Sequence, residues 1–382
     1  MDRDLIFLAT ALGAWGLGES MSLYFQSLYL QHLGADPVRI GFILGAASIA
    51  MTIAHIPAGY LADRIGRRPI IWVSWILGTL ATAIMGLARS LDVFTTGLLL
   101  YGVTMFVMAP MNSYVTAARG KLSAGRALTL VSAGYSVGAV FGPLLGGMIA
   151  DRTGNLRLTY QIAACIFFAS TLIVLCIRAQ PREAPHPAGN LVGLLAERPY
   201  RIYLGYIFLA VFAAYLAQPL SNNFLEMQHG LTFSQLGQLG SMTALGVIVL
   251  NLTIGHWEAR RGFVLAQACM AAFTLLVSRG TGLPWFAAGY FMLGAFRTMR
   301  ALAAAQTRDL VDPARMGLAY GLVETVSGLA LVLASPLAGF LFKLEPRAMY
   351  TASLGLILAS VTVGLLRIQR AINKAKPVKE TS

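Results

Sequence analysis

Charged residues are scarce in this sequence, and cysteines are scarcer still. Asp, Glu, Lys and Arg make up 12% of the 382 residues and 57% are hydrophobic, whereas a soluble domain is near a quarter charged. The three cysteines, Cys165, Cys176 and Cys269, fall inside apolar stretches, so neither a disulfide framework nor a metal site is indicated. A phosphate-binding GxxxxGK[ST] loop is absent and the loops are short, which argues against an enzyme and predicts no cofactor.

Long apolar runs recur along the chain and predict an all-α membrane protein. Each run is long enough for a helix to cross a hydrocarbon core of ~30 Å, and lipid offers the backbone no other partners. The opening stretch continues apolar to Leu30 without a clear cleavage site, so it is read as a span rather than a signal peptide. Twelve spans are predicted, near 5–32, 38–61, 69–89, 93–118, 127–150, 156–177, 202–226, 234–255, 262–280, 283–306, 316–342 and 347–367.

The net charge of +13 is explained by topology. With both termini in the cytoplasm, the cytoplasmic segments carry 20 of the 29 Lys and Arg residues, and the opposite loops carry 7. The positive-inside rule therefore favours this orientation. A soluble module with a basic, aromatic-rich patch is missing, so nucleic acid is not an expected partner.

The chain divides into two related halves. Residues 178–201 hold four prolines and several charges, and predict a cytoplasmic linker between an N-terminal bundle (1–177) and a C-terminal bundle (202–367), with a cytoplasmic tail at 368–382. A shift of 196 residues places Gly41 on Gly237 and Arg64 on Arg260. Such repeats are expected to hold a substrate site at their interface.

The segment GYLADRIGRRP, from Gly59 to Pro69, carries a family resemblance. It resembles the signature loop between spans two and three of the major facilitator superfamily. The resemblance covers the whole chain and implies two pseudo-symmetric six-helix bundles that rock around a cavity lined by spans one, four, seven and ten. It also implies a gating role for a set of loop residues: Gly59, Asp63, Arg64, Gly66, Arg67 and Arg68. The alternative is that the arginines only retain this loop in the cytoplasm.

Span five contains GYSVGAVFGPLLGG, which is similar to the so-called antiporter motif of proton-driven exporters in the superfamily. Gly138, Gly142 and Gly146 recur every four residues, and Pro143 offers a kink point, so gating and ordinary close packing are both open interpretations. Thr129 stands where the full motif has a further glycine, and span four lacks the arginine that many proton-coupled exporters carry.

Ionisable groups inside spans are costly and are therefore candidate functional residues. Glu19 in span one is the first choice for proton coupling, with a packing role as the alternative, and Glu324 in span eleven is the second. Arg297 and Arg300 in span ten either pair with Glu324, which lies at a similar depth, or bind an anionic group of the solute. Polar residues of the cavity-lining spans complete the predicted substrate site: Tyr24, Gln26, Asn112, Tyr114, Tyr215, Gln218 and Asn222.

These features predict a secondary transporter that moves a small organic solute by alternating access. The first hypothesis is efflux in exchange for protons, and the second is proton-coupled uptake of an anionic solute. A lipid flippase or a membrane sensor is a third. The expected partners are the solute, protons and the lipid bilayer, the expected location is the cell (inner) membrane, and a monomer is expected to suffice.

Overall fold

The computed structural model describes residues 3–180, 191–312 and 315–375. Within these ranges, the side chains of residues 55–64, 109, 191, 192 and 370–375 lie outside the description. Every regular element in the described part of the chain is a helix. This confirms the all-α fold class.

The first half holds six membrane-crossing segments built from eight α-helices and two short 3₁₀ turns. They are α1 (Arg3–Ser22), η1 (Leu23–Phe25), α2 (Gln26–His32), α3 (Pro37–Ile65), α4 (Arg67–Leu87), α5 (Leu91–Val103), η2 (Thr104–Val107), α6 (Met108–Ala117), α7 (Ala124–Thr153) and α8 (Leu156–Leu175).

The second half repeats this pattern, preceded by the short α9, which lies within the predicted linker. Its elements are α9 (Leu191–Ala196), α10 (Arg198–Leu216), α11 (Ser221–His229), α12 (Phe233–Ile254), α13 (Ala259–Arg279), α14 (Leu283–Leu293), α15 (Ala295–Gln306), η3 (Thr307–Asp309), α16 (Met316–Leu344) and α17 (Ala348–Ala375).

Eleven segments of the described chain are long and apolar enough to span a membrane by length and composition. The α14–α15 segment is the one predicted span outside this set. It carries Arg297 and Arg300, which lower its apolar content. It nevertheless lies within the second bundle, packed against α12 and α13, and so completes two bundles of six.

Four spans are interrupted, and they are the four that were expected to line the cavity. The first breaks at η1, the fourth at η2, the seventh between Leu216 and Ser221, and the tenth at Gly294. Pro219 explains the seventh break, because proline has no backbone N–H to donate. Irregular backbone is tolerated at membrane depth where it is buried in protein or lines a water-filled cavity. The breaks therefore mark the central surfaces of the two halves.

The first half is held together by close backbone packing. Gly134, Gly138, Gly142 and Gly146 form one stripe on α7 against α1. A Cβ added at Gly138 would overlap the carbonyl oxygen of Gly13. The stripe thus packs α7 against a helix of its own half, not against the second half.

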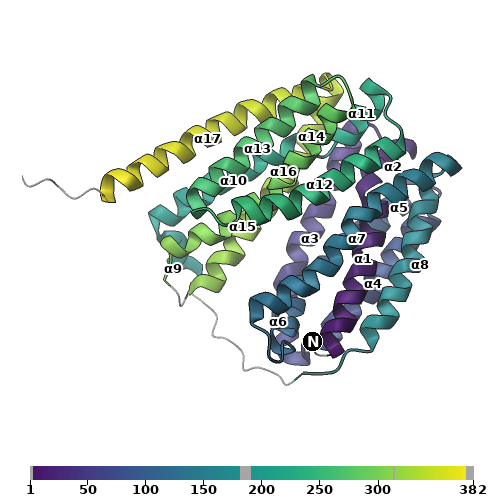
Figure 1. The fold of residues 1–382 in the computed structure, drawn as a ribbon, viewed down its shortest axis with the longest axis horizontal. Helices are drawn as coiled ribbons and strands as arrows, with labels where there is room; N and C mark the ends of the chain where they lie inside the picture. Colours follow the sequence, from purple (N-terminus) through teal and green to yellow (C-terminus); the bar gives the residue numbers. More distant parts are fainter. Residues whose placement is uncertain (1–2, 181–190, 313–314, 376–382) are drawn as a thin grey trace, which may run out of the picture.

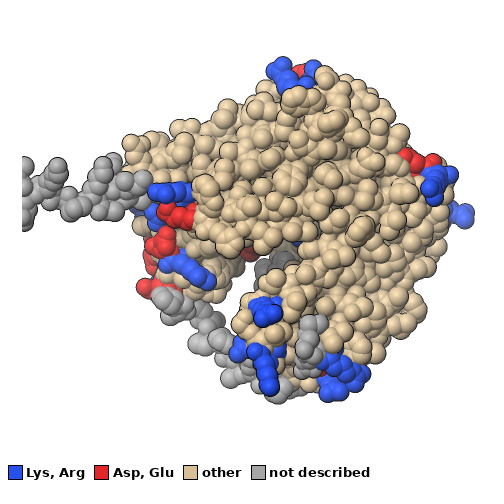
Figure 2. Space-filling view, in the orientation of Figure 1, with Lys and Arg blue, Asp and Glu red and all other residues tan. Residues whose placement is uncertain are grey.

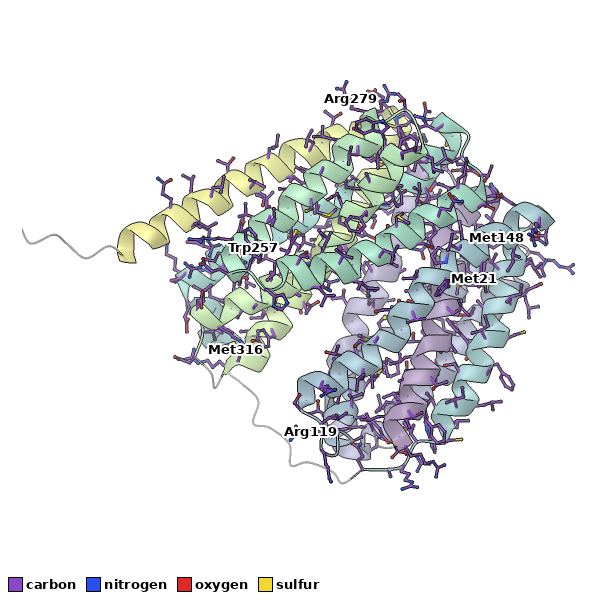
Figure 3. All side chains as sticks on the ribbon, viewed as in Figure 1. Met21, Arg119, Met148, Trp257, Arg279 and Met316 are labelled. Carbon is purple, nitrogen blue, oxygen red and sulfur yellow. The ribbon has the colours of Figure 1, made fainter. Side chains whose placement is uncertain are left out.

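The two halves meet at one end and separate at the other. α7 packs along α12 and α3 along α16, and in Figure 1 the bundles diverge from these contacts toward the end that carries the linker. We call this the linker end, and the other the closed end. Figure 2 shows the resulting hollow and a broad uncharged surface between groups of charged side chains. Figure 3 places Arg119 and Met316 on opposite sides of the opening.

Candidate functional site

The candidate site lies where the halves face each other around Glu19. Glu19 is near the end of α1, and its side chain is partly exposed. The hydroxyls of Tyr101 on α5 and Tyr135 on α7 lie close to its carboxyl. Arg297 of the second half lies close enough to attract the carboxylate electrostatically. The site therefore combines one acid and one base from opposite halves.

Arg297 projects from α15 toward the first half. Its guanidinium carbon lies 5.7 Å from the centroid of the Tyr135 ring, within the range of a cation–π contact, and the Tyr135 hydroxyl also lies close to the guanidinium. The residue remains exposed. Because Tyr135 contacts both Glu19 and Arg297, the three side chains form one connected group across the interface.

A buried aromatic cluster fixes the first-half side of this group. The indole Nε1 of Trp15 donates a hydrogen bond of 3.1 Å to the hydroxyl of Tyr101. The Trp15 ring stacks on Phe167, with centroids 3.8 Å apart, and an added Cβ at Gly78 would overlap the indole. Tyr101 therefore presents its hydroxyl to Glu19 from a rigid support.

The second arginine of span ten has a different partner. Arg300 forms an ion pair with Glu324 on α16, within the second half. The Arg300 side chain is 28% exposed and that of Glu324 is 53% exposed. Of the two pairings left open by the sequence, the structure forms the one between Arg300 and Glu324, and it places Arg297 beside Glu19.

Aromatic side chains form an apolar wall next to the arginines. Tyr215 on α10 and Phe296 on α15 are both half-buried, and their ring centroids lie 5.8 Å apart. The Tyr215 hydroxyl also lies close to Ser335 and near Arg300. The space between the halves thus borders on charged groups and partly accessible aromatic rings.

Polar contacts close the opposite end of this space. The Tyr24 hydroxyl donates to Asn222 Oδ1 at 3.2 Å, and Asn222 Nδ2 donates to the Tyr24 carbonyl at 3.0 Å. Tyr290 donates to the same Asn222 oxygen at 2.7 Å. Two predicted substrate residues therefore hold the halves together directly.

This network continues toward the closed end. Asn223 Nδ2 donates to the side chain of Gln31 at 2.6 Å, and Gln31 donates to Glu226 at 3.3 Å. His32 Nε2 also lies 3.3 Å from Glu226. Because these bonds join α2 to α11, the network spans the two halves.

A carboxylate of the first half caps a helix of the second. Asp151 near the end of α7 accepts hydrogen bonds from the backbone N–H groups of Phe233, at 2.9 Å, and Ser234, at 2.8 Å. These are the first residues of α12, where unpaired N–H groups and the helix dipole favour an anion. At the same interface, an added Cβ at Gly237 would overlap the carbonyl of Pro143.

The other predicted substrate residues are not gathered around Glu19. Tyr114 is fully buried and donates to the Arg178 carbonyl at 2.8 Å. Gln218 donates to the carbonyl of Ala214 in its own span. Asn112 is exposed toward the linker end on α6, and Gln26 is half-buried at the start of α2.

The loop that was predicted to act as a gate is described only in part. Gly66 has φ = +92° at the start of α4, a conformation that favours glycine. The Arg68 guanidinium lies 3.9 Å from the Trp72 ring centroid, and Arg67 is half-buried. The side chains of Gly59, Asp63 and Arg64 lie outside the described residues.

Several residues that lie near Glu19 or join the two halves were not predicted from the sequence. Tyr101 and Tyr135 resemble ordinary span filling, and their only signal was placement in spans four and five. Asp151 lies at a predicted span end, where a charge is unremarkable. Among the described residues, no group of three or more His, Cys, Asp and Glu side chains is arranged to hold a metal ion.

Comparisons with known proteins agree with this architecture. A family profile described as Major Facilitator Superfamily matches residues 6–203 and 202–381. "Multidrug resistance protein 2" of Bacillus subtilis (strain 168) is 22% identical over 346 residues, covering 86% of each chain. "Putative sugar efflux transporter" of Deinococcus radiodurans is 26% identical over 354 residues, covering 87% of this chain and 89% of that protein.

Solved structures show the same fold. The nucleoside transporter NupG aligns with a TM-score of 0.78 at 14% identity, covering 98% of this chain and 100% of that one. The human organic anion transporter MFSD10 (TETRAN) aligns with a TM-score of 0.66 at 15% identity, covering 95% and 99%. With the profile matching both halves, the chain belongs to the Major Facilitator Superfamily of membrane transporters.

Proposed function

We propose that this chain is a proton-coupled secondary transporter for a small organic solute, with Glu19 as its proton-binding group. The observation that carries the proposal is the position of Glu19: it lies where the two halves face each other, and two tyrosine hydroxyls and a guanidinium of the other half lie close to it. A carboxyl at membrane depth is costly and typical of proton pathways. Its partial exposure provides contact with the open space.

The proposed cycle is alternating access. The halves are separated at the linker end, which the positive-inside rule assigns to the cytoplasm, and joined at the closed end by side-chain hydrogen bonds. This arrangement is open to the cytoplasm. Breaking the closed-end contacts and bringing the linker ends together produces the outward-open arrangement.

Export in exchange for protons is one direction of this function. The relatives that support it are named a multidrug resistance protein and a sugar efflux transporter, and both align over more than four fifths of their length. In this cycle the solute and the proton compete for Glu19. Proton entry then drives the solute out of the cell.

Proton-coupled uptake of an anionic solute is the second direction. It is supported by Arg297, whose exposed guanidinium is not engaged by Glu324. A planar guanidinium suits a carboxylate or phosphate. In this cycle the solute and the proton bind together and move the same way.

The test is proton movement in proteoliposomes that contain a pH-sensitive dye. Uridine, glucose, benzoate and ethidium are added in turn to the outside. We expect one class of solute to change the internal pH, relative to protein-free liposomes, with wild-type protein and with the control Glu345→Gln, whose carboxyl is exposed at the closed end, but not with Glu19→Gln. Undiminished proton movement in Glu19→Gln would contradict the proposal. Internal alkalinisation indicates exchange, and acidification indicates co-transport.

A further inference from the structure

The two arginines of span ten are neutralised in different ways. Arg300 contacts Glu324 on the neighbouring helix of its own half, so this pair does not depend on the first half. Arg297 reaches across the interface to Glu19 and Tyr135, and it remains exposed. Arg297 is therefore the cation of this pair that a molecule in the central space meets directly.

The surroundings of Arg297 combine a charge with aromatic surface. The Tyr135 ring lies beneath the guanidinium. Phe296 packs beside Tyr215 on the side of α15 that carries Arg300. All three aromatic side chains are half-buried. Aromatic pairs add attraction beyond the area they bury, so the Tyr135 ring beside Arg297 suits a ring of the solute, while the guanidinium fork suits one carboxylate.

We infer that Arg297 is the subsite for the acidic group of the solute, that the solute is an aromatic monocarboxylate, and that its carboxylate replaces Glu19 beside the guanidinium. Glu19 is the carboxylate of this chain that attracts the Arg297 guanidinium across the interface, and the solute's own carboxylate takes over that role. Tyr135 serves both occupants, because its hydroxyl and ring contact both charged groups.

This replacement links solute binding to protons. The polar groups that face Glu19 are Tyr101 on α5, Tyr135 on α7 and Arg297 on α15, and α8 packs on α1 nearby through the uncharged ring of Phe167. When a carboxylate takes Arg297, Glu19 loses its one cationic neighbour in this set, and its protonated form is favoured. By reciprocity, a proton on Glu19 strengthens binding of the carboxylate.

The inference rests on Glu19 being the proton site of the proposed function, and it decides between the two directions. Solute and proton bind cooperatively, so they move together. Exchange would require them to compete. The sign of coupling therefore follows from the electrostatic attraction between Glu19 and Arg297.

The test is equilibrium binding of benzoate to the full chain in nanodiscs, read as a shift in apparent melting temperature and by titration calorimetry. Benzamide is the neutral analogue and benzylammonium the cationic one. We expect benzoate, which stays ionised throughout, to bind about tenfold more tightly at about pH 5.5 than at about pH 8. Benzamide and benzylammonium are expected to bind weakly at both. Equal benzoate affinity at the two pH values, no benzoate binding, or benzamide binding as tightly as benzoate would each overturn the inference.

Two variants test the roles of Glu19 and Arg297 separately. Glu19→Gln is expected to bind benzoate at both pH values as tightly as wild type does in acid. Arg297→Gln is expected to bind it about ten- to hundred-fold more weakly, the loss expected for a hydrogen bond to a charged group. Arg89→Gln, an exposed arginine at the closed end, is the matched control. If a variant does not fold, the benzoate affinities of the wild-type protein at the two pH values still test the inference.

The inference and the proposed function fail separately. If Glu19-dependent proton movement occurs in proteoliposomes but benzoate binding shows no acid dependence, the substrate assignment fails and the transporter proposal stands. If benzoate binds with the expected acid dependence but no added solute moves protons, the binding site stands and the coupled-transport proposal fails.

Discussion

Asp151→Asn is expected to weaken the contact between the two halves at the closed end. The carboxylate of Asp151 accepts two bonds from the first N–H groups of α12, at 2.9 and 2.8 Å. An asparagine keeps one acceptor oxygen, and loses the second bond and the charge that complements the helix dipole. A charge at a helix N-terminus contributes about 0.3 to 1 kcal/mol, and a bond to a charged group more. Because Asp151 is exposed to solvent screening, we expect a net loss of about 1 kcal/mol.

A loss of this size changes the ratio of the two arrangements about fivefold. The assay is the distance between spin labels on cysteines at Arg89 and Arg279 at the closed end, and at Arg119 and Trp257 at the linker end, with the native cysteines replaced. Asp151→Asn is expected to lengthen the first distance and shorten the second.

The matched control is Asp92→Asn. Asp92 pairs with Arg39 at 3.1 Å, also at the closed end but within the first half, so its loss is expected to leave both distance distributions unchanged. Equal effects of the two variants, or no effect of Asp151→Asn, would refute the capping argument.

Three further predictions concern stability and are read from apparent melting temperatures. Gly138→Ala is expected to destabilise the chain by about 1 to 3 kcal/mol, because its Cβ would overlap the backbone of α1; Gly125→Ala on the same helix meets open space, and an equal loss there would contradict this. Glu324→Gln is expected to cost about 1 kcal/mol after allowance for exposure, by leaving its half-buried arginine partner uncompensated, and no change would count against the pair. The backbone N–H of Arg39 lowers the pKa of Asp36. The contribution of the Asp36 carboxylate to stability is therefore present above its ordinary pKa and is lost as the pH falls through the lowered pKa. A loss of stability in acid that persists undiminished in Asp36→Asn would refute this assignment.

The sequence was sufficient for the membrane architecture. Lipid requires each span to satisfy its own backbone, so apolar length alone placed α12, for example, near 234–255 where the helix covers Phe233–Ile254. The sequence did not predict where the spans are interrupted. Gly294 breaks the tenth span, but glycine is common in membrane helices and most glycines of this chain lie inside unbroken ones.

The site was only partly predictable. Glu19 and the arginines were identified because charge in a span is costly. Their partners depend on helix rotation and on the contact between halves, which periodicity does not give. Arg297 and Arg300, three residues apart, were equivalent by depth, and only the structure separates the Glu324 contact from the Glu19 contact.

In the proposed cycle, the two halves must exchange their open and closed ends for a solute to cross. The most direct measurement is solute uptake by a chain with cysteines at 119 and 257, joined by a short, cleavable bifunctional maleimide that reacts only when the linker end is closed. We predict that uptake stops on cross-linking and returns on cleavage. Undiminished uptake by the cross-linked protein would contradict the account.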